Sequence, residues 1–325
     1  MMATAYWVEA PGRASLRTEP VSAPGADDVL VRTLYTGISR GTESIVFRGE
    51  VPYTEWERMR APFQQGDFPA PVKYGYLTVG VVEQGPDGTA GRTVFVLHPH
   101  QSQFVVPASA VAIVPDGVPT RRAVLAGAVE TAVNILWDAA PLVGDRITVI
   151  GAGMIGCAVA RLARGMPGVE VAVVDIDRAK ADVCERLGVA YAHPEDAPTE
   201  RDLIIDTSGS SDGLQLAIDT AATEGEIIEA SWFGDRPANV RLGGAFHSRR
   251  LTIRSSQVGM VSPRRRGSRT TGDRLALALR LLHDPAFDSL LTGDSSWRDL
   301  PDVMARIAAG SLPGLCHTID WRDPA

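Results

Sequence analysis

The sequence predicts an α/β protein in which a β-rich domain precedes a domain built on a doubly wound parallel sheet. The first part of the chain contains short Val-rich segments separated by Gly, Pro and Asp turns, a pattern typical of strands: 29–38, 76–85, 93–98 and 103–115. After Pro119, apolar segments of strand length alternate with segments of helical periodicity. Near-continuous apolar strands that alternate with helices indicate a parallel sheet covered on both faces.

The alternation begins with an expected helix over residues 120–140. Strands are expected at 146–151, 169–175, 202–208, 225–233 and 251–258, with helices between them at about 153–166, 178–187 and 212–222. The tail should add helices at 273–283 and 298–309 and a strand at 316–321. We therefore expect a first domain at 1–118, the doubly wound domain at 119–260, and a tail at 261–325 that returns to the first domain.

The bulk composition fits a two-domain globular protein. The chain has 325 residues, 45% of them hydrophobic and 22% charged, and one hydrophobic core seldom organises that length. A net charge of −7 argues against nucleic-acid and anionic-membrane partners. No apolar run reaches the ~20 residues that span a bilayer, and the start MMATAYWVEAPGR lacks the pattern of a secretion signal. Because Cys157, Cys184 and Cys316 form no paired motif, we expect a cytoplasmic protein without disulfides.

A glycine-rich turn is the most informative motif. In RITVIGAGMIG, Gly151, Gly153 and Gly156 follow an apolar strand and open a helix that starts with Met154 and Ile155. The first glycine permits a tight turn, the second lets the backbone approach a pyrophosphate, and the third allows close contact between helix and strand. The free N–H groups of the helix start favour an anion. The alternative is a glycine turn that binds nothing, but the context predicts a Rossmann dinucleotide site.

An acidic residue ends the next strand at the position where such sites bind ribose. Asp175 closes VEVAVVD about twenty residues after the glycines, where a carboxylate can accept hydrogen bonds from the ribose hydroxyls. The same charge would repel the phosphate of NADP, although Arg178 nearby could accommodate it. We therefore favour NAD(H) over NADP(H).

Further cofactor contacts are expected where the later strands end. Thr207 and Ser208 follow DLIID, and Ala230 and Ser231 follow EIIE, so these residues should lie on the carboxyl edge where ligands bind in this architecture. Each of them could equally be the polar start of a loop with no ligand contact.

Four segments resemble the medium-chain dehydrogenase/reductase superfamily over essentially the whole chain: GISRGTE (37–43), GYLTVGVV (75–82), VPDGVPTRRAVLA (114–126) and VGDRITVIGAGMIG (143–156). The resemblance implies a GroES-like substrate domain before the Rossmann domain. FHSRRLTIRSSQV (246–258) is similar to the branch typified by bacteriochlorophyllide hydroxyethyl dehydrogenase. The resemblance also places Thr131, in the expected linking helix, near the nicotinamide, although helical threonines often bond only to their own backbone.

The residues that bind catalytic zinc in the resembling enzymes are replaced here. Ser39 stands where the family has a cysteine, Gly75-Tyr76-Leu77 where it has Gly-His-Glu, and Gly127 where it has a further Cys or Glu. Catalytic zinc needs thiolate, imidazole or carboxylate ligands, which Ser, Tyr and Gly do not supply. The four-cysteine structural lobe of the family is also missing. We expect no zinc, and hence a hydrogen-bond donor and proton relay in its place.

The candidates for that relay are Tyr76, Ser39, Glu43, Lys73, His98 and His100. By resemblance Tyr76 should face the reaction centre, and its phenol could donate to the substrate oxygen or merely fill the space left by zinc. Histidine titrates near neutrality, so His98 and His100 are candidate acids or bases, unless they are surface or capping residues. Glu43 could take a proton or cap the backbone. Lys73 could lower a tyrosine pKa or be a solvated charge.

Three further segments bear on substrate and partners. Residues 53–68 carry Trp56, Phe63 and other apolar side chains that could wall a substrate pocket or pack as an ordinary loop. The run at 262–271 holds four arginines that could recognise an anionic substrate or remain a solvated basic loop. The strand 251–258 should lie at a sheet edge and pair across a twofold axis, so we expect a homodimer.

The sequence thus predicts a zinc-independent NAD(P)(H)-dependent oxidoreductase that transfers a hydride between nicotinamide and a secondary alcohol or carbonyl. A zinc-free reductase of activated C=C bonds, of the quinone or enoyl type, is the nearest alternative. A non-catalytic NAD(H)-binding protein is a third, because the loss of zinc removes the most recognisable catalytic part.

Overall fold

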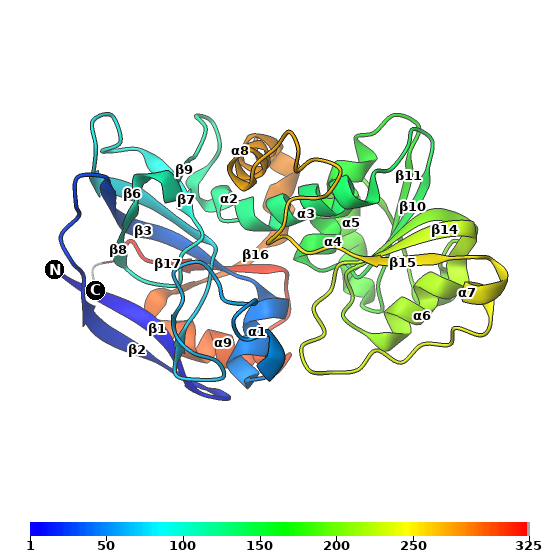
Figure 1. The fold of residues 1–325 in the computed structure, drawn as a ribbon, viewed down its shortest axis with the longest axis horizontal. Helices are drawn as coiled ribbons and strands as arrows, with labels where there is room; N and C mark the ends of the chain where they lie inside the picture. The colour runs from blue at the N-terminus through cyan, green and yellow to red at the C-terminus, as the bar shows by residue number, and fades with distance from the viewer. Residues whose placement is uncertain (324–325) are drawn as a thin grey trace. The chain divides into compact units, whose positions relative to one another are not determined.

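In the computed structural model, which describes residues 1–323, the chain divides into two compact units (Figure 1). Unit 1 comprises Met1–Gly127, Leu279–His283 and the chain from Leu291 onward. Unit 2 comprises Ala128–Ala278 and Asp284–Leu290. The chain leaves unit 1 inside helix α3 (Ala126–Ala139), whereas the sequence placed this division at 118/119.

Unit 1 contains two sheets. A four-stranded sheet has the order β2-β1-β5-β4, formed by β1 (Met2–Ala10), β2 (Arg13–Pro20), β4 (Gln65–Gly66) and β5 (Val72–Lys73). A seven-stranded sheet has the order β16-β17-β3-β6-β7-β9, with β8 also paired to β3; its strands are β3 (Asp28–Ile38), β6 (Thr78–Gln84), β7 (Thr93–Val96), β8 (Gln103–Pro107), β9 (Ala112–Ile113), β16 (Leu291–Ser296) and β17 (Cys316–Asp320). The tail strand β17 runs antiparallel to β3.

The helices of unit 1 are short and lie between these strands. They are α1 (Arg40–Arg48), α2 (Thr120–Ala123) and α9 (Leu300–Ala308), with 3-10 turns at Tyr53–Glu55, Ala108–Ala110 and Trp297–Asp299. A cluster of mainly β-branched side chains is buried on the inward faces of β3, β6, β7 and β8, and such side chains pack well on a pleated surface. The cluster consists of Val29, Val31, Val82, Val94, Val96, Phe104 and Val106. This packed cluster fixes the strands on which the polar residues of unit 1 are mounted.

Unit 2 contains one six-stranded sheet in which every pairing is parallel. Its order is β12-β11-β10-β13-β14-β15, formed by β10 (Arg146–Ile150), β11 (Glu170–Val174), β12 (Ala190–Ala192), β13 (Arg201–Asp206), β14 (Ala221–Glu229) and β15 (Thr252–Ser255). The order reverses at β10, as in a doubly wound dinucleotide-binding domain. The predicted fold class is therefore confirmed, and β15 lies at an edge of the sheet as expected.

The helices of unit 2 follow its strands. They are α4 (Met154–Arg164), α5 (Ala181–Leu187), α6 (Ser211–Thr220) and α7 (Ala245–Ser248), with α8 (Thr271–Leu281) later in the chain and 3-10 turns at Arg178–Lys180, Pro194–Asp196 and Pro285–Leu290. The expected helix at 120–140 is broken into α2 and α3, while the expected helix at 153–166 is present as α4. Within residues 1–323, no helix is long and apolar enough to cross a lipid bilayer.

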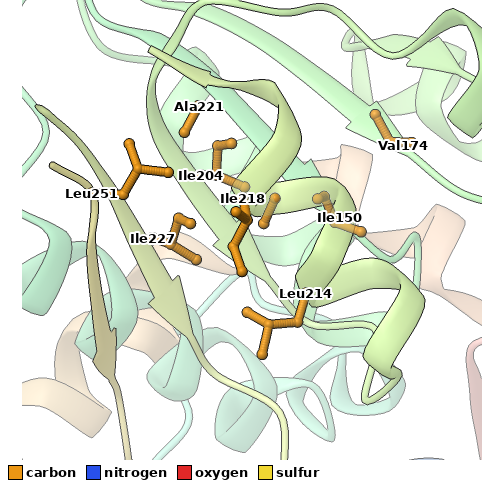
Figure 2. Close-up of a cluster of buried hydrophobic side chains, with 9 residues drawn as sticks. Ile150, Val174, Ile204, Leu214, Ile218, Ala221, Ile227 and Leu251 are labelled. Atoms are coloured by element: carbon orange, nitrogen blue, oxygen red, sulfur yellow. The ribbon is translucent and has the colours of Figure 1, made fainter. Parts of the chain in front are cut away.

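The hydrophobic core of unit 2 holds the carboxyl edge of the sheet in place. Figure 2 shows Ile204 and Ile227 from neighbouring strands packed with Ile218 of α6, and Leu214 lies one helical turn earlier. These residues are buried because the parallel strands are covered by helices, which explains their continuous apolar sequence. The register aligns Ile150 of β10 with Asp206 of β13, and Asp206 with Glu229 of β14, so the strands end together.

Candidate functional site

The glycine turn, residues 151–156, joins β10 to α4. Gly151 has a φ of +95°, a conformation that favours glycine, and a Cβ there would lie 2.9 Å from the Ser208 backbone nitrogen. A Cβ on Gly156 would lie 2.0 Å from the Gly151 carbonyl oxygen. A Cβ on Gly153 would meet nothing within 4 Å. Two glycines thus permit close packing inside the turn, and the third leaves open space beside the backbone, as the three expected roles require.

The N-terminus of α4 can also receive a ligand. Gly153 is the N-cap of this eleven-residue helix, and no side chain caps it. The first-turn N–H groups, which include those of Met154 and Ile155, therefore keep the hydrogen-bonding capacity that a helix start offers to a phosphate. This arrangement and the open space at Gly153 fit a pyrophosphate.

Asp175 follows β11 and lies beside the glycine turn. Its Oδ2 accepts from the Ala152 backbone N–H at 2.6 Å, and its Oδ1 accepts from the Asp177 N–H at 2.8 Å. These bonds fix the carboxylate, and each oxygen still has a lone pair that could accept a ribose hydroxyl. Arg178 is exposed in the following 3-10 turn, 3.8 Å from Glu195.

The other residues predicted to contact the cofactor lie on the carboxyl edge or in α3. Thr207 Oγ1 donates to the carbonyl of Gly151 at 2.9 Å, so it ties β13 to the glycine turn. Ser208 N–H donates to Asp206 Oδ1 at 2.8 Å, and Ala230 N–H donates to the Asp206 carbonyl at 2.9 Å. Thr131 is half-buried in α3. Thr207, Ser208 and Ala230 therefore gather on the predicted edge of the sheet.

In unit 1 the structure brings four of the predicted catalytic candidates together. Tyr76 Oη donates to Ser39 Oγ at 2.6 Å, and the Ser39 backbone N–H donates to Glu43 Oε1 at 2.7 Å. The other oxygen of Glu43, Oε2, accepts from His100 Nε2 at 2.8 Å. We call Ser39, Glu43, Tyr76, His100 and Thr36 the polar cluster. Ser39 precedes α1 and Glu43 lies in its first turn, which explains why one carboxylate can reach both Ser39 and His100.

Thr36 and Trp321 complete the far side of the polar cluster. His100 Nδ1 lies 2.7 Å from Thr36 Oγ1, which also accepts from Trp321 Nε1 at 3.0 Å. His100 is 1% exposed, so its ring contacts its protein neighbours and is shielded from solvent. Neither Thr36 nor Trp321 was predicted from the sequence.

Tyr76 differs from the deeper members of the polar cluster because it is only half-buried. Burial and the nearby charge of Glu43 raise the pKa of Tyr76 to about 12. The phenol therefore keeps its proton at neutral pH and can donate it in a hydrogen bond. Tyr74 packs edge-on against Tyr76 with ring centroids 6.1 Å apart, which limits the movement of the ring.

Two other candidates lie in different surroundings. His98 is stacked on Phe104 at a centroid distance of 3.6 Å and on Phe63, and its Nδ1 lies 2.9 Å from the Pro99 carbonyl oxygen. His98 is buried, so its interpretation as a surface residue is wrong. Burial also lowers the pKa of His98 to about 3. Lys73 is 1% exposed and bonds to Glu19 and to Gln101, so its reading as a solvated charge is also wrong. Burial lowers the pKa of Lys73.

At the positions where the resembling enzymes have zinc ligands, the residues of this chain contact one another. The Ser39 and Tyr76 hydroxyls bond to each other. Leu77 packs against Gly127 so closely that a Cβ on Gly127 would lie 2.5 Å from Leu77 Cδ2. Over residues 1–323 there is no group of three or more His, Cys, Asp or Glu side chains arranged to hold a metal ion.

The 53–68 segment and the arginine-rich run at 262–271 have different surroundings. Trp56 Nε1 donates to the Val51 carbonyl at 3.1 Å, which holds the 53–68 segment against its own start. In unit 2 the arginine-rich run is exposed, and in the described chain none of its arginines forms an ion pair: Arg264, Arg265, Arg266 and Arg269.

Sequence reasoning also missed a pair of acids in unit 2. Asp206 and Glu229 end the adjacent strands β13 and β14, and their Cα atoms are partners in the register. The signal was present, since LIID and IIE each end an apolar strand in a carboxylate.

The chain is similar to proteins that are named dehydrogenases. No family model matches the chain. It is 25% identical over 313 residues to the D-guloside 3-dehydrogenases of Shigella flexneri and Escherichia coli K12, with 87% of each chain covered. Both relatives are named dehydrogenases, in agreement with the predicted class of enzyme.

Solved structures match nearly the whole chain. An alcohol dehydrogenase from Escherichia coli CFT073 in complex with NADH has a TM-score of 0.77 at 17% identity, covering 98% of this chain and 99% of that one. L-idonate 5-dehydrogenase from Escherichia coli K-12 has a TM-score of 0.80 at 13% identity, covering 98% of both chains. A protein from Sinorhizobium meliloti 1021 bound to NADP has a TM-score of 0.78 at 17% identity, covering 98% and 99%.

The chain shares the fold of these dehydrogenase structures. Structural neighbours include both an NADH complex and an NADP complex, so the fold alone does not choose between the two cofactors. The finer resemblance to the bacteriochlorophyllide branch stays a prediction.

Proposed function

We propose that this chain is an NAD(P)(H)-dependent dehydrogenase that transfers a hydride between nicotinamide and a secondary alcohol or its carbonyl, without zinc. The observation that carries the proposal is the glycine turn, with its open space at Gly153 and the fixed carboxylate of Asp175 beside it. The names of the curated relatives favour a hydroxyl group on a sugar derivative as the reacting group.

The donor set supports zinc independence. Catalytic zinc requires ligands that are anionic or imidazole, and the corresponding positions carry Ser39, Tyr76, Leu77 and Gly127. The close packing of Leu77 on Gly127 also fills the space that a third ligand would need.

The proposed cofactor is NAD(H) in preference to NADP(H). Both oxygens of Asp175 already accept a backbone hydrogen bond, which stabilises the charged carboxylate. A fixed negative charge attracts ribose hydroxyls and repels a ribose phosphate. Arg178 is exposed and lies beside Glu195, so it is not held toward Asp175.

A mechanism follows from the side chains of the polar cluster. Bound nicotinamide would supply or accept the hydride. Tyr76 would turn its one phenolic hydrogen from Ser39 Oγ to the substrate oxygen and give up that proton as a carbonyl is reduced, since its raised pKa keeps the phenol protonated. The Ser39 hydroxyl would then donate its own hydrogen to the phenol oxygen and so position the ring, while Glu43 holds the Ser39 backbone. His100 is buried and acts as a positioning residue through Glu43.

The decisive experiment uses the full chain after treatment with a chelator. NAD⁺ or NADP⁺ and a panel of polyols and glycosides are supplied, and the formation of reduced nicotinamide is followed. Tyr76→Phe should lower kcat by about 100-fold, because general acid–base groups contribute that order, while the Kd for NADH stays unchanged. Tyr74→Phe is the matched control, since Tyr74 contacts the same ring without bonding to Ser39.

The results of this experiment distinguish the candidate functions. Activity that is lost on chelation and restored by zinc contradicts metal independence. An unchanged kcat in Tyr76→Phe removes Tyr76 from the chemistry. Hydride uptake by enones or quinones alone would favour the C=C reductase, and NADH binding without turnover of any substrate would favour the non-catalytic protein.

We further propose a homodimer formed through β15. Its position at the edge of the sheet leaves one side of the strand without a neighbour in the described chain. A second copy paired there would satisfy those backbone groups.

A further inference from the structure

The acid pair, Asp206 and Glu229, lies at the carboxyl edge of the sheet in unit 2. Parallel strands are about 4.8 Å apart, and these residues are register partners on adjacent strands. Asp206 is buried and Glu229 is half-buried, and one oxygen of each, Asp206 Oδ2 and Glu229 Oε2, is shielded from water. Two carboxyl groups thus lie side by side at the ends of neighbouring strands.

Each acid of the pair accepts one backbone hydrogen bond and keeps one buried oxygen without a partner. Asp206 Oδ1 accepts from Ser208 N–H at 2.8 Å, and Glu229 Oε1 accepts from Ser231 N–H at 2.7 Å. The remaining oxygens, Asp206 Oδ2 and Glu229 Oε2, are buried and have no donor partner. Two charged carboxylates cannot donate to each other, so a hydrogen bond between these two oxygens requires one proton on the pair.

The electrostatics agree with a shared proton. Burial, followed by the charge of Asp206, raises the pKa of Glu229 to about 8. Burial also raises the pKa of Asp206. Charged side chains on the surrounding elements are exposed or bonded elsewhere: Asp212 and Asp219 on α6, Arg254 on β15, which binds Glu226, and Arg236, which donates to the Gly209 carbonyl.

The acid pair anchors the two loops that begin where β13 and β14 end. Ser208 and Ser231, whose N–H groups it binds, are the second residues of these loops. The loops are also joined directly, since Gly209 N–H donates to Ser231 Oγ at 2.9 Å. Thr207 connects the first loop to the Gly151 carbonyl of the glycine turn. A change in the acid pair would therefore reach the backbone beside the proposed dinucleotide site.

We propose that Asp206 and Glu229 share one proton and so act as positioning residues, which hold both loops in the arrangement that binds the nicotinamide dinucleotide. This inference rests on the proposed function. Loss of the proton to solvent leaves two adjacent buried negative charges, which repel each other and separate the strand ends. Cofactor affinity then falls as pH rises.

The test is a fluorescence titration of the full chain with NADH at several pH values. Above about pH 8, binding that requires the shared proton should weaken by about tenfold per pH unit. In Glu229→Gln the amide can donate permanently to Asp206 and accept from Ser231, so the Kd should no longer change with pH. Asp212→Asn removes the same charge from an exposed site on α6 and should keep the wild-type pH dependence.

A second readout separates this inference from the proposed function. The infrared C=O stretch of a protonated carboxylic acid should disappear from the wild-type apoprotein above about pH 9 and be absent at neutral pH from Glu229→Gln. Identical pH profiles of NADH affinity in wild type and Glu229→Gln overturn the positioning role. Absence of the infrared band in wild type overturns proton sharing. If no nicotinamide dinucleotide binds at any pH, the proposed function fails together with the positioning role, and the band alone decides whether the proton is shared.

Discussion

The glycine turn of unit 2 and the polar cluster of unit 1 present their functional atoms by different means. The glycine turn uses backbone atoms, and its close contacts are possible only because side chains are missing. The polar cluster uses hydroxyl, carboxyl and imidazole groups joined by hydrogen bonds. The first should therefore be damaged by adding atoms and the second by removing them. Gly156→Ala tests the first expectation and Tyr76→Phe tests the second. Experiments on Gly156, Asp175 and His98 follow, beginning with the largest expected effect.

Gly156→Ala should be the most damaging change. The new methyl group would lie 2.0 Å from the Gly151 carbonyl oxygen and 2.6 Å from Thr207 Oγ1, so the turn must shift. Overpacking of this kind costs about 1–3 kcal/mol, and thermal unfolding should show a lower Tm together with a loss of NADH binding. Gly153→Ala is the control, since it meets open space and should keep the wild-type Tm while it weakens NADH binding. Equal Tm values for Gly156→Ala and wild type would contradict the packing role.

Asp175→Ala should have a smaller and more selective effect. Removal of the carboxylate takes away the ribose acceptor and the repulsion of a ribose phosphate. We expect about tenfold weaker NADH binding, the scale of one charge-assisted hydrogen bond, and little loss or a gain for NADPH, both measured as Kd. Asp177→Ala provides a control in the same loop. An unchanged preference between the two cofactors would refute the ribose assignment.

His98 should give no titration at all near neutrality. Its pKa is lowered to about 3 by burial, so the ring stays neutral between about pH 5 and pH 8. The unfolded chain takes up a proton below about 6.5, so the folded state should lose stability as pH falls through that window. Nuclear magnetic resonance of the ring protons provides the measurement. Exposed His283, whose pKa is raised by hydrogen bonds to the Arg280 and Asp116 carbonyls, is the control that should titrate. A His98 midpoint near neutrality would reopen its role as an acid or base.

The same contrast explains what could be predicted from the sequence. The glycine turn, Asp175 and the strand ends at Thr207 lie on successive strand–turn–helix units, so their roles follow from local pattern. The polar cluster depends on tertiary register. Thr36 lies opposite Thr78 in one strand pair and opposite Ile319 in the other, and no local pattern places it beside His100.

The interpretations of Lys73 as a solvated charge and of His98 as a surface residue were wrong for the same physical reason. Lys73 and His98 are residue types usually found in solvent, and here they are buried against partners that the folded structure supplies: Glu19 and Gln101 for Lys73, and Phe104 and Pro99 for His98. Glu19 and Gln101 lie far from Lys73 in the sequence, whereas Pro99 and Phe104 lie close to His98, whose ring stacks on Phe104 only in the folded chain. These contacts form only in the folded protein, so no periodic pattern in the sequence predicts them.

The pairing of β17 with β3 has a consequence for the order in which the molecule is made. During translation the ribosome releases all six strands of unit 2 before it releases β17, the strand that joins β3. Trp321, whose indole N–H bonds to Thr36, emerges just after that strand. A nascent chain can therefore complete its Rossmann sheet while the hydrogen-bonded network around His100 still lacks a member, and that network becomes whole only once synthesis has passed Trp321.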